Sequence, residues 1–68
     1  MKYDFTKKEL DYIIENANFT DEQEKIFKML TSKYGRASIV KISMEMNMSE
    51  STVKRRIKQI KNKIIKIL

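Results

Sequence analysis

Apolar residues recur at helical spacing over most of the chain, and clusters of polar, turn-forming residues interrupt them at three places. The first apolar run follows the motif TKKE, Thr6 to Glu9. Its members are Leu10, Ile13, Ile14 and Ala17. A Thr followed three residues later by Glu has the form of a capping box, in which each side chain bonds the other residue's backbone N–H. This pattern predicts a helix that begins just after Thr6.

A second helix is predicted after the motif TDEQ, Thr20 to Gln23, which repeats the capping-box form. Acidic residues occupy its first turn, where the helix dipole favours negative charge. Ile26, Phe27 and Leu30 follow at helical spacing. We expect this helix to end near Tyr34-Gly35, because Gly is the usual residue just past a helix end.

The second half of the chain predicts two helices joined by a three-residue turn. The shorter one fits Ser38 to Met46, with Ile39, Ile42 and Met46 facing inward. Asn47-Met48-Ser49 breaks the pattern, since Asn tolerates the left-handed backbone conformation and Ser can cap a following helix. The longer helix begins at about Glu50. It carries one continuous apolar stripe made of Val53, Ile57, Ile60, Ile64 and Ile67.

These four helices, together with the absence of Pro and the presence of one Gly, predict an all-α fold. At 68 residues the chain is long enough for one domain, residues 1–68. Two short helices around a tight turn, the second of them basic, predict a helix-turn-helix over about residues 38–63. Residues 64–68 then extend its long C-terminal recognition helix.

The net charge of +6 is unevenly distributed. Residues 51–68 carry seven basic residues and no acidic one, which favours a polyanionic partner met by one end of the molecule. The alternative is a Lys-rich surface that only keeps the protein in solution. With no His and no Cys in so short a chain, we expect neither an enzyme nor a metal, cofactor or small-molecule site.

A helical wheel locates the cations of the last helix relative to its apolar stripe. If Val53 faces the core, the opposite side presents Ser51, Arg55, Lys58 and Asn62, with Lys54 beside them. Of these, Ser51, Lys54, Arg55 and Lys58 belong to the first turns and are expected to reach base edges. We expect the DNA backbone to be contacted by Ser49, Thr52, Arg56, Lys61, Asn62 and Lys63. Like charges such as Lys54 and Lys58 lie four residues apart, and no acid relieves their repulsion.

The segment Thr20 to Ile64 resembles the LuxR/GerE-type DNA-binding domain and is similar to region 4 of bacterial sigma factors. The specific part of the resemblance is MSESTVK, Met48 to Lys54. It implies a helix-turn-helix in which Lys54, Arg55 and Lys58 contact bases and Thr52 helps to seat the helix on the DNA backbone. The chain departs from the family in one extra residue before Ile42 and in Asn47 and Arg56, so the base sequence recognised is left open.

The tail KIIKIL has three interpretations. It can fold back onto the first helix as part of the core, or it can lie on anionic lipid as a basic amphipathic helix. The third interpretation, which we adopt, is a homodimer seam that sets two recognition helices about 34 Å apart, one turn of DNA. This seam would consist of Ile60, Ile64, Ile65, Ile67 and Leu68.

Together these features predict a sequence-specific protein that binds double-stranded DNA, used in transcription regulation. An accessory DNA-binding factor of a mobile element would have the same features. The alternative from another class is a protein-interaction module that mimics a sigma region and engages polymerase or an anti-sigma partner. No apolar run is long enough to span a membrane and the charged start is no signal peptide, so we expect a cytoplasmic protein.

Overall fold

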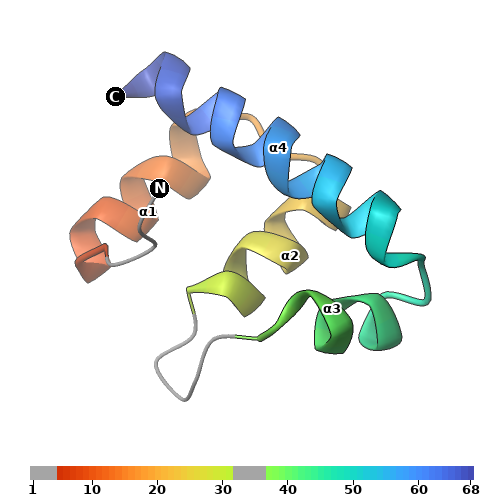
Figure 1. Ribbon diagram of the computed structural model, residues 1–68. Helices are drawn as coiled ribbons and strands as arrows, with labels where there is room; N and C mark the ends of the chain where they lie inside the picture. Colours follow the sequence, from red (N-terminus) through yellow and green to blue (C-terminus); the bar gives the residue numbers. More distant parts are fainter. Residues whose placement is uncertain (1–4, 32–36) are drawn as a thin grey trace.

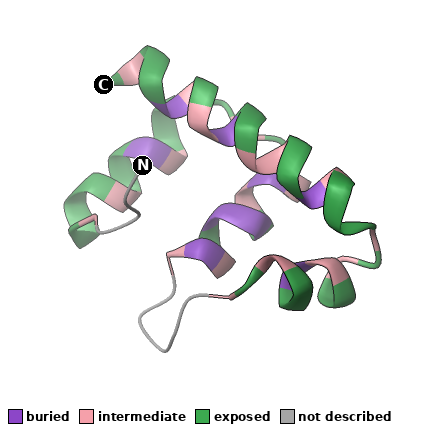
Figure 2. Ribbon diagram, viewed as in Figure 1, coloured by how far each residue is buried: buried purple, intermediate pink, exposed green. Residues whose placement is uncertain are grey.

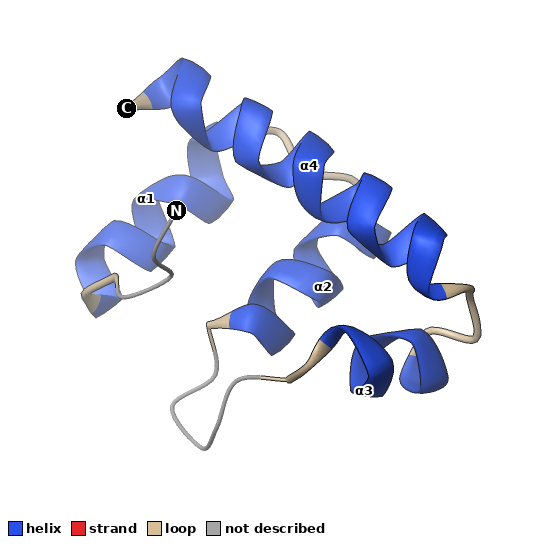
Figure 3. Ribbon diagram, viewed as in Figure 1, coloured by secondary structure: helices blue, strands red, loops and turns tan. Residues whose placement is uncertain are grey.

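The computed structural model describes residues 5–31 and 37–68, which form four α-helices. They are α1 (Lys7–Asn16), α2 (Asp21–Leu30), α3 (Ile39–Glu45) and α4 (Glu50–Ile67). The long α4 runs across one side of the molecule, with α1, α2 and α3 beneath it (Figure 1). The described residues contain no strand (Figure 3). The predicted all-α fold is confirmed.

Each helix begins at a hydroxyl residue that caps it. Thr6 and Thr20 form the two expected capping boxes, with Thr20 accepting from the backbone N–H of Gln23 and the Gln23 side chain accepting from that of Thr20. Ser38 and Ser49 cap α3 and α4 in the same way, through the N–H three residues on. A cap of this kind stabilises a helix by about 1 kcal/mol.

The connections between helices use the left-handed conformation where the sequence allows it. Asn47, between α3 and α4, has φ 54°, as predicted, and Asn18, between α1 and α2, has φ 57°. Asn adopts this region more readily than most residues because its short polar side chain can bond locally. α2 ends at Leu30, and the predicted end near Tyr34-Gly35 lies outside the described residues.

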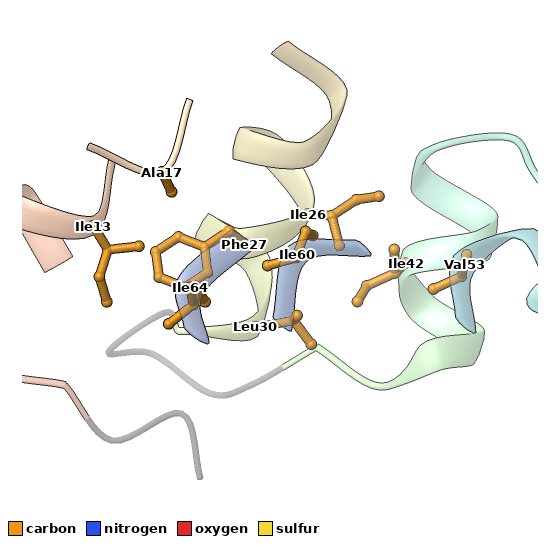
Figure 4. Packing of buried hydrophobic residues seen from close by; sticks show 9 residues of the cluster. All are labelled: Ile13, Ala17, Ile26, Phe27, Leu30, Ile42, Val53, Ile60 and Ile64. Carbon is orange, nitrogen blue, oxygen red and sulfur yellow. The ribbon is translucent and has the colours of Figure 1, made fainter. Parts of the chain in front are cut away.

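One hydrophobic core joins all four helices. Its buried apolar members are Ile13, Ala17, Ile26, Phe27, Leu30, Ile42, Val53, Ile60 and Ile64 (Figures 2 and 4). The centroid of the Phe27 ring lies 5.2 Å from that of Phe19 and 6.2 Å from that of Phe5. Because Phe5 precedes α1 and Phe19 follows it, these contacts pack both ends of α1 onto α2. Burying a side chain of this size stabilises the fold by about 1.5–3 kcal/mol.

The helix-turn-helix consists of α3, the turn at residues 46–49 and α4. Ile42 of α3 and Val53 of α4 are both fully buried, and they lie beside each other in Figure 4. Met46, Met48 and Ile57 are partly buried against the same cluster. This packing holds α4 across α3 with one side of α4 open to solvent.

The C-terminal half of α4 packs on α1 as well as α2. Ile64 lies near Ile13 of α1 and Phe27 of α2 (Figure 4). Ile60 and Ile64 are 0% exposed, so the prediction that they belong to an exposed dimer seam is wrong. The stripe is longer than a helix-turn-helix alone requires because α1 also covers it. None of the described helices is both long and apolar enough to cross a membrane.

Candidate nucleic-acid interface

The outer face of α4, opposite its buried stripe, is exposed to solvent. It consists of Ser51, Lys54, Arg55, Lys58, Asn62 and Lys66, all exposed. Ser51, Arg55 and Asn62 lie about half a turn from Val53, since successive residues are separated by about 100°. Of the four residues predicted to contact bases, Ser51 and Arg55 lie at the middle of this face, and Lys54 and Lys58 lie on its side nearer α3.

The outer face is strongly cationic. After Glu50 in its first turn, α4 contains no acidic residue through Ile67. Lys54 and Lys58 are exposed one helical turn apart, and Arg55 lies beside both. Repulsion between like charges at this spacing destabilises an isolated helix by a few tenths of a kcal/mol, and a bound polyanion would relieve it.

The edge of α4 that faces α3 borders a shallow hollow. Its lining is Ile39, Lys54, Ile57, Lys58 and Lys61. The two isoleucines are partly buried and form an apolar floor, whereas the lysines form a basic rim. Such a surface can accept a group with an apolar body and an anionic edge, as the sugar–phosphate backbone of DNA has.

The opposite edge of α4 faces the beginning of α2, where an acidic residue pairs with one of its cations. Arg56 donates from Nε to Oε1 of Glu22 at 2.5 Å. The side chains are 33% and 40% exposed respectively, so the ion pair lies at the surface. It borders a second hollow, lined by Thr20, Glu22, Gln23, Arg56 and Gln59. The predicted backbone contact Arg56 thus has an acidic partner within the domain.

Lys63 is also engaged within the domain. Its Nζ donates to the backbone carbonyl of Asn18 at 2.9 Å and to Oε1 of Gln23 at 2.6 Å. Gln23 is buried, at 6% exposure, and its Nε2 donates to Gln59 at 3.4 Å. These bonds connect α4 to α2 and to the α1–α2 connection. We therefore leave Lys63 out of the proposed interface.

At the start of α4, two predicted backbone contacts form the helix cap. The Ser49 hydroxyl accepts from the N–H of Thr52 at 3.2 Å, and the two hydroxyl oxygens lie 2.9 Å apart. The exposed Glu50 carboxylate follows immediately. The hydroxyl groups of Ser49 and Thr52 lie at the surface, but their hydrogen bonds within the cap fix their orientation.

The apolar surface near the C-terminus is smaller than predicted. Ile65 and Leu68 are exposed, at 66% and 72%, and Ile67 is partly buried against the core. Elsewhere on the surface, exposed apolar side chains include Tyr12 on α1 and Val40 and Met44 on α3. The predicted seam is thus reduced to Ile65 and Leu68 with part of Ile67.

Sequence patterns missed the polar residues that fix α4 on its α2 side, namely Asn18, Glu22, Gln23 and Gln59. One signal was present: Gln23 lies four residues before Phe27 and three before Ile26, at a buried position of α2. Comparison of the chain with protein-family models, with curated proteins and with solved structures gave no match. The functional argument therefore depends on the site itself.

Proposed function

We propose that the protein binds double-stranded DNA by inserting α4 into the major groove, and that it acts as a sequence-specific transcription regulator. The observation that carries the proposal is the outer face of α4, where Lys54, Arg55 and Lys58 are exposed while Val53 of the same turns is buried in the core. The major groove is about 12 Å wide and admits one α-helix. The cations that must face the DNA are thus free of the core.

The proposal assigns different contacts to different parts of the outer face. Ser51, Lys54, Arg55 and Lys58 would meet base edges, because Arg and Lys donate well to O6 and N7 of guanine. Asn62 and Lys66, farther along the 18-residue helix, would meet phosphates. Lys61 and the apolar floor beside it would lie against the sugar–phosphate backbone. Half or more of the hydrogen bonds in such complexes go to the backbone, so this division is the usual one.

Salt-dependent binding to a labelled duplex tests the proposal. The wild-type chain is compared with a triple variant, Lys54→Ala with Arg55→Ala and Lys58→Ala. The control variant removes three exposed cations elsewhere, by Lys7→Ala, Lys8→Ala and Lys25→Ala. Each phosphate contact contributes about −0.9 to the slope of log K against log salt. We expect salt-dependent binding by the wild-type chain and a much larger loss of affinity in the first variant than in the control variant; equal losses in both would contradict a specific α4 interface.

A protein-interaction module, such as a sigma-region mimic that engages polymerase or an anti-sigma partner, is the second candidate function. It is favoured by Val40 and Met44, which are four residues apart on α3 and are 51% and 76% exposed. Replacing both by Gln should leave duplex binding unchanged if α4 alone contacts DNA. If the triple α4 variant retains full duplex binding, the α3 surface becomes the better candidate site.

A further inference from the structure

The ion pair between Glu22 and Arg56 places a carboxylate at the edge of the proposed DNA-binding face. Glu22 belongs to the first turn of α2, and Arg56 follows Arg55 of the outer face on α4. Oε1 of Glu22 accepts from Nε of Arg56 at 2.5 Å. An oxygen anion is therefore already bound to a cation that borders the proposed DNA-binding face.

The ion pair between Glu22 and Arg56 can be broken at a low cost in free energy. Both side chains are more than 30% exposed, at 33% for Arg56 and 40% for Glu22, so water can solvate either partner once they separate. Exposed ion pairs contribute at most about a five-fold factor to an equilibrium constant. The guanidinium has five N–H donors in a planar fork that suits carboxylate and phosphate equally, and the Glu22 bond uses one of them.

We propose that the Glu22 carboxylate takes the place of a DNA phosphate in the free protein, and that Arg56 exchanges it for a phosphate when a duplex binds. The inference rests on the proposed function of α4. In the exchange the Arg56 guanidinium changes its bonding partner from the Glu22 carboxylate to a phosphate, and Glu22 becomes solvated. Glu22 thereby reduces the affinity for DNA, and Arg56 contributes one phosphate contact that the free protein conceals.

The test compares Glu22→Gln with Glu24→Gln in duplex binding. Glu24 is a matched control, because it lies on the same helix and its carboxylate pairs, at 3.8 Å, with the ammonium group of Lys28 on α2 rather than with a residue of α4. Both variants remove one negative charge, so general electrostatics cancels between them. We expect Glu22→Gln to bind about two- to five-fold more tightly than Glu24→Gln. Equal affinities, or weaker binding by Glu22→Gln, would overturn the proposal.

The second readout is the salt dependence of variants at Arg56. Arg56→Gln keeps part of the side-chain stem and removes the charge. We expect it to make the slope of log K against log salt shallower by about 0.9 in both the wild-type and the Glu22→Gln backgrounds, because Arg56 reaches one phosphate in both complexes. An unchanged slope would mean that Arg56 stays with Glu22 in the complex. Circular dichroism of each variant verifies that the helices are retained.

The outcomes separate this inference from the function on which it rests. Loss of binding in the triple variant of Lys54, Arg55 and Lys58 supports the α4 interface whatever Glu22 does. Normal wild-type binding with no difference between Glu22→Gln and Glu24→Gln overturns the exchange alone. A wild-type chain without salt-dependent duplex binding overturns both.

Discussion

Lys63 of α4 donates a hydrogen bond to the backbone carbonyl of Asn18, across 45 positions in the sequence. The same ammonium group bonds Gln23, so a cation of the basic helix holds the α1–α2 connection in place. The seven basic residues of positions 51–68 are therefore not equivalent. Arg56 and Lys63 bond residues of α2 and the α1–α2 connection, whereas Lys54, Arg55, Lys58 and Lys66 are exposed on the outer face.

The first prediction separates these two roles. Lys63→Ala should lower the free energy of unfolding by about 1 kcal/mol, because it removes hydrogen bonds from a charged donor that is only partly shielded from water. It should leave the salt slope of duplex binding unchanged. Lys66→Ala, on the exposed outer face, should do the reverse. Thermal denaturation and binding at several salt concentrations measure both; a changed slope for Lys63→Ala would place that residue on phosphate.

The second prediction tests the rotational setting of α4. Val53→Asp should unfold the domain, because Val53 is fully buried where α3 and α4 meet and an unpaired buried carboxylate costs several kcal/mol. Arg55→Asp, two residues on and exposed, should stay folded and lose duplex binding. Circular dichroism measures whether each variant is folded, and a duplex-binding titration measures the loss of affinity. A folded Val53→Asp variant would show that the inward and outward faces of α4 are wrongly assigned.

Sequence alone predicted where the helices begin, because each beginning depends on residues next to one another in the chain. Thr6, Thr20, Ser38 and Ser49 cap the four helices. The left-handed Asn47 was equally local. The apolar stripe of α4 also followed from spacing, because the buried side of a helix repeats every three to four residues.

Contacts between helices were harder to predict from the sequence. A wheel of α4 places Arg56 and Lys63 on its flanks, but which side chains face them depends on how α2 and α1 cross α4. Glu22, one turn before the buried Ile26, was the available clue to an acid on the inner flank of α2. The expected exposure of Ile60 and Ile64 was wrong for a related reason, since the cover that α1 gives Ile64 is visible only in the assembled fold.

The third prediction concerns base recognition by the outer face. Arg55→Ala and Lys58→Ala should each weaken binding to a preferred duplex by about 1–3 kcal/mol and binding to bulk DNA by less. The preferred duplex can be obtained by selection from a random pool with the wild-type chain. Equal losses on both DNAs would show that these residues contact phosphate only.

The fourth prediction concerns self-association. Ile65 and Leu68 remain as exposed apolar residues at the end of α4. A symmetric dimer formed there would present two copies of α4 to two half-sites on the DNA. We expect the wild-type chain to form a dimer in sedimentation experiments over a concentration series. Ile65→Gln with Leu68→Gln should shift it to monomer without unfolding it. A monomeric wild type, or a dimer that survives both substitutions, would rule out this seam.

The fifth prediction concerns the capping box of α2. Thr20→Ala should lower the free energy of unfolding by about 1 kcal/mol, because the N–H of Gln23 loses its acceptor. Thr20→Ser keeps the hydroxyl and should restore most of that loss. Chemical denaturation of the three proteins measures the difference. The same loss with Ser would assign the effect to the Thr methyl group.

The uninterrupted helix α4 constrains how such a domain can diverge. Its inner and outer faces share one register, since Glu50–Ile67 contains no break. A single residue inserted after Val53 would turn the rest of the helix by about 100°. The present Gln59 and Lys63 would then occupy the places of Ile60 and Ile64 in the core. Relatives of this protein should therefore vary the outer face by substitution while keeping the length of α4 fixed, or change that length by about two whole turns at once.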